Sequence, residues 1–315
     1  MDKLKIFFLN VGHGDCAYID MPNGARMMID CGCGEDHWPS TLLKHYNVTK
    51  DNPVPILEED RAYGIDELVI SHPHGDHIAD IKNIRDEIGF YLLSGGYSGF
   101  IDKLSADDID FKKRGKDAAN IFFEVVKGHK GGIYEQKKDR VYNARPSCVV
   151  KSRRFINYSE GMDLNELSLF VSFSIGGHKV LFTGDMTATG IRKILSSPSA
   201  QEFVDFVNGT TVLKVPHHGR ENGCSEEMFK LLGGKPIACI ASDETLNEKN
   251  AGTSNIDWYG KRTSDEDIMV NGRLESRKVF TTRNDKDIAC SITTDGDLSF
   301  DTNVFSELKN QIYGR

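Results

Sequence analysis

Short runs of continuous or alternating apolar residues occupy both ends of the chain, and they predict strands. Residues 5–12 (KIFFLNVG) form a continuous apolar run, and residues 16–32 (CAYID, MPNG, ARMMIDCG) predict two short strands joined by a Pro-Asn-Gly turn. Residues 167–175 (LSLFVSFSI) alternate cleanly, and residues 179–186 (KVLFTGDM) follow as the partner strand. Further strands are predicted at residues 66–70, 211–215, 236–242, 278–284 and 288–300.

Apolar residues at helical spacing follow several of these strands. Residues 77–88 (HIADIKNIRDEI) have isoleucines at positions 78, 81, 84 and 88, which predicts a helix directly after the strand at 66–70. Helices are also predicted at residues 40–47, 187–197 and 225–234, while residues 35–66 otherwise, 91–164 and 257–268 show weak periodicity. Each half is β-rich and then β/α, which favours an α/β fold with two sheets packed face to face and helices outside.

Composition narrows the class of protein. The chain has 315 residues, enough for two small domains or one large layered domain, and its 39% hydrophobic and 27% charged residues exclude a disordered or fibrous protein. The seven cysteines are an odd number without redox spacing, so we expect reduced thiols in a cytoplasmic protein. No run approaches the roughly 18 apolar residues of a membrane span, so a soluble protein without a membrane partner is expected.

The charge is distributed unevenly. The formal net charge of −8 argues against indiscriminate binding to nucleic acid or to anionic membranes. Residues 127–154, however, hold nine Lys/Arg and two Asp/Glu, a local charge of +7. This segment is either a solvated loop or a guide for a phosphate backbone.

The densest candidate chemistry lies in residues 71–77, SHPHGDH, where the predicted strand ends. His72, His74, Asp76 and His77 provide imidazole nitrogens and a carboxylate, which Zn²⁺ and similar ions prefer. In a strand-end loop, residues 72 and 74 can point the same way and share one ion, while residues 76 and 77 begin the helix and face a second. Two ions about 3.5–4 Å apart also require a bridging carboxylate and at least one further ligand.

Two later strands end in suitable groups. Asp185 follows an apolar strand in FTGDM, where a carboxylate is either paired with a cation or a metal, or caps the next helix. His217 and His218 end the strand at 211–215. Because adjacent residues of a strand point in opposite directions, we expect one of the two to ligate, and the other to contact substrate or stabilise developing negative charge. The residues alone do not decide which.

The motif His72-x-His74-x-Asp76-His77 resembles the signature of the metallo-β-lactamase superfamily. The chain is similar in particular to the branch of soluble hydrolases related to the competence-protein domain of bacterial DNA-uptake channels. That similarity includes FLNVGHGDCAYID, in which His13 replaces the usual glutamine, NELSLFVSF with Asn165 and Ser168, LFTGDM, LKVPHHG, and the ending VFTTRNDKDIACSITTDGD. The resemblance covers nearly the whole chain. It implies one domain over residues 1–315, a four-layer αββα sandwich, with a basic loop insertion at about 91–164.

The resemblance also implies site roles. Asp185 would bridge the ions, and one histidine of the 217–218 pair would complete the second site. The superfamily's usual third-site histidine is not evident, since His129 lies in a basic loop and His178 in a hairpin turn; Asn165 occupies the region instead. Lys261 stands where relatives often have histidine, and an ammonium there would hold an anionic group.

Three residues near the first strands complete the candidates. Asp30 is expected to support the metal loop by accepting a hydrogen bond, or to be an ordinary turn aspartate. His13 and Asp15 are candidate substrate or supporting residues. Cys31 and Cys33 are read as packing thiols in preference to a thiolate metal site.

These residues predict a dinuclear metal-dependent hydrolase. Its nucleophile would be a metal-bridging hydroxide oriented by Asp76, and its cofactors two divalent ions, Zn²⁺ first and Mn²⁺ or Fe²⁺ as alternatives. The leading substrate class is a phosphodiester or other small anion, including single-stranded nucleic acid. The alternatives are a lactone or acyl-ester hydrolase, and a non-catalytic sensor or interaction subunit that keeps its metal. The oligomeric state does not follow from the sequence.

Overall fold

Two β-sheets form the centre of the protein in the computed structural model, which describes residues 2–34, 38–54, 63–95, 115–128, 140–145, 148–157, 162–242 and 255–314. The first sheet has the strand order β13 (Arg273–Glu275), β12 (Ile268–Val270), β16 (Leu298–Thr302), β15 (Ile288–Thr293), β1 (Lys3–Phe8), β2 (Ala17–Asp20), β3 (Arg26–Ile29), β4 (Ile65–Ile70) and β5 (Phe90–Gly95). The second has the order β14 (Val279–Thr281), β11 (Ala238–Ala241), β10 (Val212–Lys214), β9 (His178–Phe182), β8 (Phe170–Ile175), β7 (Cys148–Phe155) and β6 (Arg140–Arg145).

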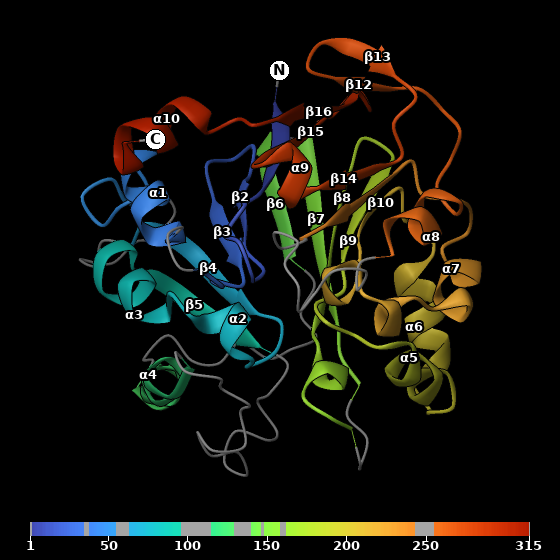
Figure 1. Ribbon diagram of the computed structural model, residues 1–315, viewed down its shortest axis with the longest axis horizontal. Helices are drawn as coiled ribbons and strands as arrows, with labels where there is room; N and C mark the ends of the chain where they lie inside the picture. The colour runs from blue at the N-terminus through green and yellow to red at the C-terminus, as the bar shows by residue number, and fades with distance from the viewer. Residues whose placement is uncertain are drawn as a thin grey trace.

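Helices cover the outer face of each sheet (Figure 1). The first sheet is covered by α1 (Pro39–His45), α2 (Gly75–Ile78), α3 (Ile81–Asn83), a π-helical turn (Ile84–Ile88), α4 (Gly115–Gly128) and α10 (Ser306–Tyr313). The second is covered by α5 (Ala188–Leu195), α6 (Ala200–Val207), α7 (Glu226–Leu231) and α8 (Ile256–Gly260). Short α9 (Thr282–Asp285) follows β14.

The apolar residues separate into three clusters that match the four layers. In β1, Leu4, Ile6 and Phe8 face the second sheet, while Phe7 packs on the helical side. In β8, Val171 and Phe173 likewise join the cluster between the sheets. Alternate side chains of a strand point to opposite faces, so period-two alternation buries both faces of each sheet. The expected four-layer αββα fold is therefore confirmed.

Most predicted elements are present, but residues 91–164 and 257–268 contain more regular structure than their sequence indicates. The first segment includes α4, β6 and β7, and the second includes most of α8. Periodicity is hidden in β7 because Arg154, a charged residue, occupies a position that faces the core between the sheets. Whether residues 91–164 are an insertion stays a prediction.

The charge of +7 counted over residues 127–154 does not lie entirely on the surface. Arg154 is buried, and its Nη2 donates to both carboxylate oxygens of Glu67, at 2.7 Å each. Charged groups are rarely tolerated in a protein core without a partner, and Glu67 neutralises this one. Residues 129–139, which include His129, and residues 146–147 lie outside the described residues.

The strand directions bring the polar motifs to one place. Strand β4 runs parallel to β3, and β10 runs parallel to both β9 and β11. Because the carboxyl ends of parallel strands meet at one edge, each sheet presents its strand-end loops together. Within the described part of the chain, no helix is long and apolar enough to cross a membrane.

Candidate metal centre

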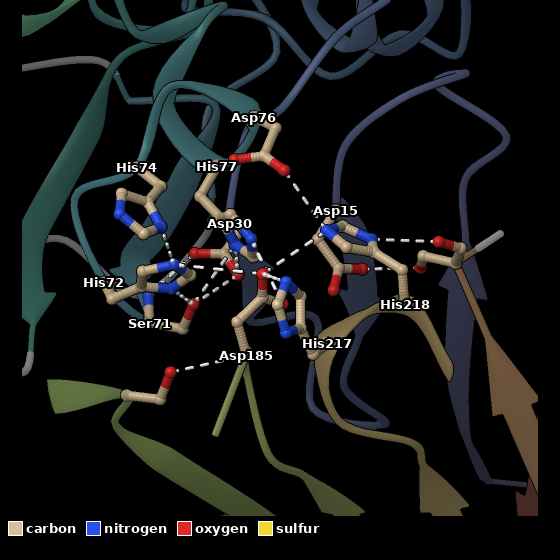
Figure 2. A network of polar contacts seen from close by, with 12 residues as sticks. Asp15, Asp30, Ser71, His72, His74, Asp76, His77, Asp185, His217 and His218 are labelled. Atoms are coloured by element: carbon tan, nitrogen blue, oxygen red, sulfur yellow. Dashed lines mark hydrogen bonds and ion pairs between the residues drawn. The ribbon is translucent and has the colours of Figure 1, made fainter. Parts of the chain in front are cut away.

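Loops at the carboxyl ends of strands from both sheets converge on one cluster of imidazole and carboxylate groups (Figure 2). Strand β4 of the first sheet leads into His72, His74, Asp76 and His77, with Asp76 and His77 in α2. Strands β9 and β10 of the second sheet lead to Asp185 and to the pair His217–His218. Groups more than 100 positions apart in the sequence therefore face one another across the junction of the sheets.

One part of the cluster contains the first two histidines of the motif. The Nε2 atom of His72 lies 2.9 Å from Nδ1 of His74 and 4.0 Å from Oδ2 of Asp185. On the far side of the His72 ring, Nδ1 lies 3.2 Å from the Ser71 hydroxyl. The two imidazoles thus direct nitrogen atoms at a common point beside Asp185.

The other part consists of Asp76, His77, Asp185 and His218, whose ligand atoms all lie within 4.8 Å of one another. The Nε2 atom of His218 is 3.2 Å from Oδ2 of Asp76 and 3.4 Å from Oδ2 of Asp185. The Nε2 atom of His77 is 3.4 Å from the second Asp185 oxygen, Oδ1. Asp185 therefore lies between the two parts, as a bridging carboxylate must.

Hydrogen bonds donated by Nδ1 orient two of these histidines. The Nδ1 of His77 donates to Oδ2 of Asp30 at 2.8 Å, and the Nδ1 of His218 donates to the backbone carbonyl of Ser242 at 2.9 Å. Each bond fixes the ring and leaves Nε2 directed into the cluster, the arrangement typical of metal-ligating histidine. Asp30 also accepts from the backbone and hydroxyl of Ser71, which fits a supporting acceptor.

The residues present fit divalent ions. The buried atoms Nε2 of His77 and Oδ1 of Asp185 face each other, yet neither has a hydrogen-bond partner in the described structure. Buried polar atoms without a partner are costly, and an ion between them would satisfy both. Imidazole nitrogen with carboxylate oxygen is a donor set suited to Zn²⁺. Asp185 is not the cap of the following helix, because Thr187 accepts the capping hydrogen bond of α5.

The pair His217–His218 does not have the expected strand-end geometry, and which of the two ligates stays a prediction. Both Nε2 atoms approach Oδ2 of Asp185, at 3.7 Å for His217 and 3.4 Å for His218. The reason is that neither residue is extended: φ is 48° and 54°, in the left-handed region that residues other than glycine seldom adopt. The tight turn aims both rings at the same carboxylate, which a strand end would not do.

The electrostatics divide the histidines into two sets. Burial lowers the pKa of His72, His74 and His217, so these imidazoles are neutral and ready to ligate. For His77 and His218, burial is outweighed by Asp185 and its neighbouring carboxylates, which raise the pKa of His77 and bring that of His218 to about 10. Conversely, the nearby imidazoles outweigh burial and hold the pKa of the Asp76 and Asp185 carboxyls well below the usual range.

The remaining predicted site residues differ in how they lie relative to the cluster. His13 is exposed beside the cluster, with Nε2 3.5 Å from Oδ2 of Asp76. Asn165 lies next to His74, where it partly counters the effect of burial on the pKa of that histidine. Lys261 is exposed directly after α8, and its role in holding an anionic group stays a prediction.

The cysteines beside the metal loop behave as packing residues in part. Cys31 is buried in the apolar cluster under α1 and α2, and its backbone N–H donates to the carbonyl of His77. Burial raises the pKa of the Cys31 thiol, which disfavours a thiolate ligand. Cys33 is half-buried.

Sequence reasoning missed several residues that hold the centre. Ser71 binds Asp30, Ser242 orients His218, and Lys214 forms a buried ion pair with Asp15. Lys214 carried a usable signal, because a lysine at the end of an apolar strand requires a partner. Ser242 had none, since its contribution to His218 is a backbone carbonyl.

Part of the chain is similar in sequence to a known protein family. The family model of the metallo-beta-lactamase superfamily matches residues 9–100, which include the whole of the His72–His77 motif. Over these residues the chain is similar to the superfamily, and the His/Asp cluster fits the binding of divalent ions. Curated proteins give no match, and the branch related to competence proteins stays a prediction.

Solved structures with similar folds have low identity. A Thermotoga maritima protein assigned as a metallo-beta-lactamase is 14% identical (TM-score 0.41), with 67% of this chain and 94% of that chain covered. A Parabacteroides distasonis protein assigned as a metal-dependent hydrolase is 14% identical (TM-score 0.42; 89% and 93% covered). Zn²⁺-bound PqqB from Methylobacterium extorquens is 10% identical (TM-score 0.39; 84% and 87% covered).

Gly32 provides a test of how tightly the superfamily motif is packed. A Cβ atom at position 32 would lie 1.8 Å from the backbone oxygen of Asp76 and 2.8 Å from the backbone nitrogen of Asp15. Because backbone atoms cannot rotate away, Gly32→Ala is expected to displace the Asp76 loop, destabilise the fold by about 1–3 kcal/mol or more and weaken metal binding. Urea unfolding and metal titration measure both effects.

Gly234→Ala is the matched control, because a Cβ there meets nothing within 4 Å and no positive φ is involved. Equal unfolding midpoints for the two variants would show that the Asp76 loop does not lie against Gly32.

Metal binding is expected to release protons. In the metal-free protein the raised pKa values keep protons on His77 and His218 at neutral pH, and an ion must displace them from Nε2. Affinity for divalent ions should therefore rise as the pH rises from neutral towards about 10. Over the same window the metal-free protein should lose stability, because a pKa raised above its unfolded value stabilises the fold only while the proton stays bound.

Calorimetric titration in buffers of different ionisation enthalpy measures the protons released. Net release should be clear near neutral pH and should diminish as the pH approaches the pKa of His218. Binding without proton release at neutral pH would contradict the protonated state of both histidines.

Proposed function

We propose that this protein is a dinuclear metal-dependent phosphodiesterase, with Zn²⁺ as the best-suited ion. His72, His74 and Asp185 would hold one ion, with His217 close enough to contribute. Asp76, His77, His218 and Asp185 would hold the other. When bound, such ions acidify water and stabilise negative charge on the oxygen atoms of the reacting group.

The choice of a phosphodiester substrate rests on the cationic and hydrogen-bond-donating side chains at the accessible side of the cluster. The side chain of His13 is 48% exposed, and those of Asp76 and His217 are 19% and 12% exposed. Arg220 follows the His217 turn and is close enough for its charge to help lower the pKa of His217. Imidazole and guanidinium donors at the accessible side favour an anionic ester over an apolar lactone.

The protein residues have distinct parts in such a reaction. The Arg220 guanidinium would bind non-bridging phosphate oxygens. Oδ2 of Asp76, near Nε2 of both His13 and His218, would orient the attacking water by accepting a hydrogen bond from it. The exposed ring of His13 would contact the substrate or donate a proton to the leaving group.

Two further expectations belong with this proposal. A short single strand of nucleic acid is one phosphodiester substrate that fits the accessible cations. The basic residues within 127–154, apart from the buried Arg154, would be its guide. A cytoplasmic location also stays a prediction.

The test compares substrates and one matched pair of variants. Bis(p-nitrophenyl) phosphate, p-nitrophenyl acetate and an acyl-homoserine lactone are assayed with Zn²⁺ or Mn²⁺. The proposal expects phosphodiester hydrolysis, and an increase in KM of about tenfold or more for that substrate in Arg220→Gln, because a charge-assisted hydrogen bond is lost. Arg192→Gln, at an exposed position of α5, is the control.

The other outcomes have defined meanings. Turnover of the lactone or the acetate alone would replace the proposal with acyl hydrolysis. Stable metal binding without turnover of any of the three substrates would favour a sensor or interaction subunit.

A further inference from the structure

A buried ion pair joins the two sheets directly behind the metal centre. Lys214, the last residue of β10 in the second sheet, is 2% exposed, and its Nζ lies 2.6 Å from Oδ2 of Asp15. Asp15 belongs to the loop between β1 and β2 of the first sheet and is itself buried. The mechanism proposed above uses neither residue, although burial of two charges requires a reason.

The pair is connected to both halves of the centre. The second Asp15 oxygen, Oδ1, accepts from the Ser242 hydroxyl at 2.5 Å, and the carbonyl of Ser242 accepts from Nδ1 of His218. On the other side, the backbone N–H of Asp15 donates to the carbonyl of Asp76 at 3.0 Å. Figure 2 shows Asp15 beside His218.

The charge of Lys214 is needed at this point. Ligand atoms of Asp15, Asp30 and His77 lie within 4.8 Å of one another, so two carboxylates approach the same imidazole. Without a cation, Asp15 would be a buried and uncompensated charge, which is costly, and its side chain would move. The ammonium of Lys214 occupies the position of a counter-ion and keeps the Asp15 carboxylate turned towards Ser242.

We infer that Lys214 is a positioning residue for the metal centre. Its ammonium fixes Asp15, which fixes Ser242 and the Asp76 loop, and these in turn fix the distance between His218 of the second sheet and Asp76 of the first. The inference rests on the proposed metal centre, but not on the substrate class.

Lys214→Met keeps most of the side-chain length and removes the charge. The variant is expected to bind one of the two ions about 10- to 100-fold more weakly, the usual effect of losing a partner behind a metal ligand. The double variant Lys214→Met/Asp15→Asn should recover most of the affinity, because no unpaired carboxylate remains and the amide oxygen can still accept from Ser242.

Stepwise Zn²⁺ affinities are measured by chelator competition on the full chain. A second readout needs no metal: in ¹⁵N NMR of the imidazoles, the hydrogen-bonded Nδ1–H of His218 should be protected in the wild type and lost in Lys214→Met. The control is Lys179→Met on neighbouring β9, where the ammonium binds the carbonyl oxygens of Phe206 and Asn208 and not the centre.

Ser242→Ala is the milder variant if Lys214→Met does not fold. It removes the hydroxyl that joins Asp15 to the Ser242 carbonyl, and it should also weaken Zn²⁺ binding and deprotect the His218 Nδ1–H. Wild-type affinity in the folded variants, or failure of the double variant to exceed Lys214→Met, would overturn the inference while leaving phosphodiester hydrolysis intact. Conversely, an inactive wild type whose ion affinity still depends on Lys214 would overturn only the proposed function.

Discussion

Asp185→Asn is expected to abolish most of the hydrolytic activity and to weaken the binding of both ions. Asp185 approaches His72 and His217 on one side and His77 and His218 on the other, so its carboxylate serves both halves of the centre. Loss of a group behind a ligand typically costs 10–100-fold in affinity or activity. Loss of a carboxylate shared by two ions should therefore cost at least about 100-fold in kcat/KM.

A metal-free measurement accompanies the kinetics. Because the Asp185 charge outweighs burial and raises the pKa of His218, Asp185→Asn should move that pKa down from about 10 towards its ordinary range in an NMR titration. Asp205→Asn, an exposed carboxylate on α6 that accepts from Gln201, is the control. Unchanged ion affinity in folded Asp185→Asn would remove Asp185 from the centre.

Among the single variants considered, Arg154→Met is expected to cause the largest loss of unfolding free energy. Arg154 of β7 and Glu67 of β4 pair in the core between the sheets, where neither side chain is exposed, and the Ser94 hydroxyl also donates to the Glu67 carboxylate. Removing the guanidinium leaves a buried carboxylate, which costs about 3–5 kcal/mol of unfolding free energy. Urea unfolding monitored by fluorescence and circular dichroism measures the change.

The neighbouring residue offers a matched control. Arg153 is partly exposed, and its guanidinium lies 5.5 Å from the centre of the Phe206 ring, so Arg153→Met should cost about 1 kcal/mol or less. The double variant Glu67→Gln/Arg154→Met should recover most of the stability, because it removes the unpaired charge. Similar midpoints for Arg153→Met and Arg154→Met would show that the buried pair does not stabilise the fold.

Local apolar patterns were sufficient to predict the strands whose two faces are both buried. Strand β1 and strand β8 bury both faces, so their apolar runs identified them directly. The metal loop was also local, because His72 to His77 lie within one strand-end turn. Strand β7 was missed because its inward-facing Arg154 is neutralised by Glu67, 87 positions earlier.

The arrangement behind the ligands could not be predicted in the same way. Asp15 meets Lys214 across 199 positions and Ser242 across 227, and no local period encodes such contacts. The orientation of His217 and His218 depends on a left-handed turn. Residues other than glycine seldom adopt this conformation, so the sequence does not predict it. These long-range contacts decide how the motif is held, whereas the motif alone indicates the chemistry.

The most direct test of the dinuclear centre is the number of divalent ions bound per chain after dialysis against Zn²⁺, measured by elemental analysis of the wild type beside Asp185→Asn. The centre described above predicts about two ions per wild-type chain and fewer in the variant. A wild-type chain that retains no zinc would contradict the assignment of His72, His74, Asp76, His77, Asp185 and the His217–His218 pair as a metal site.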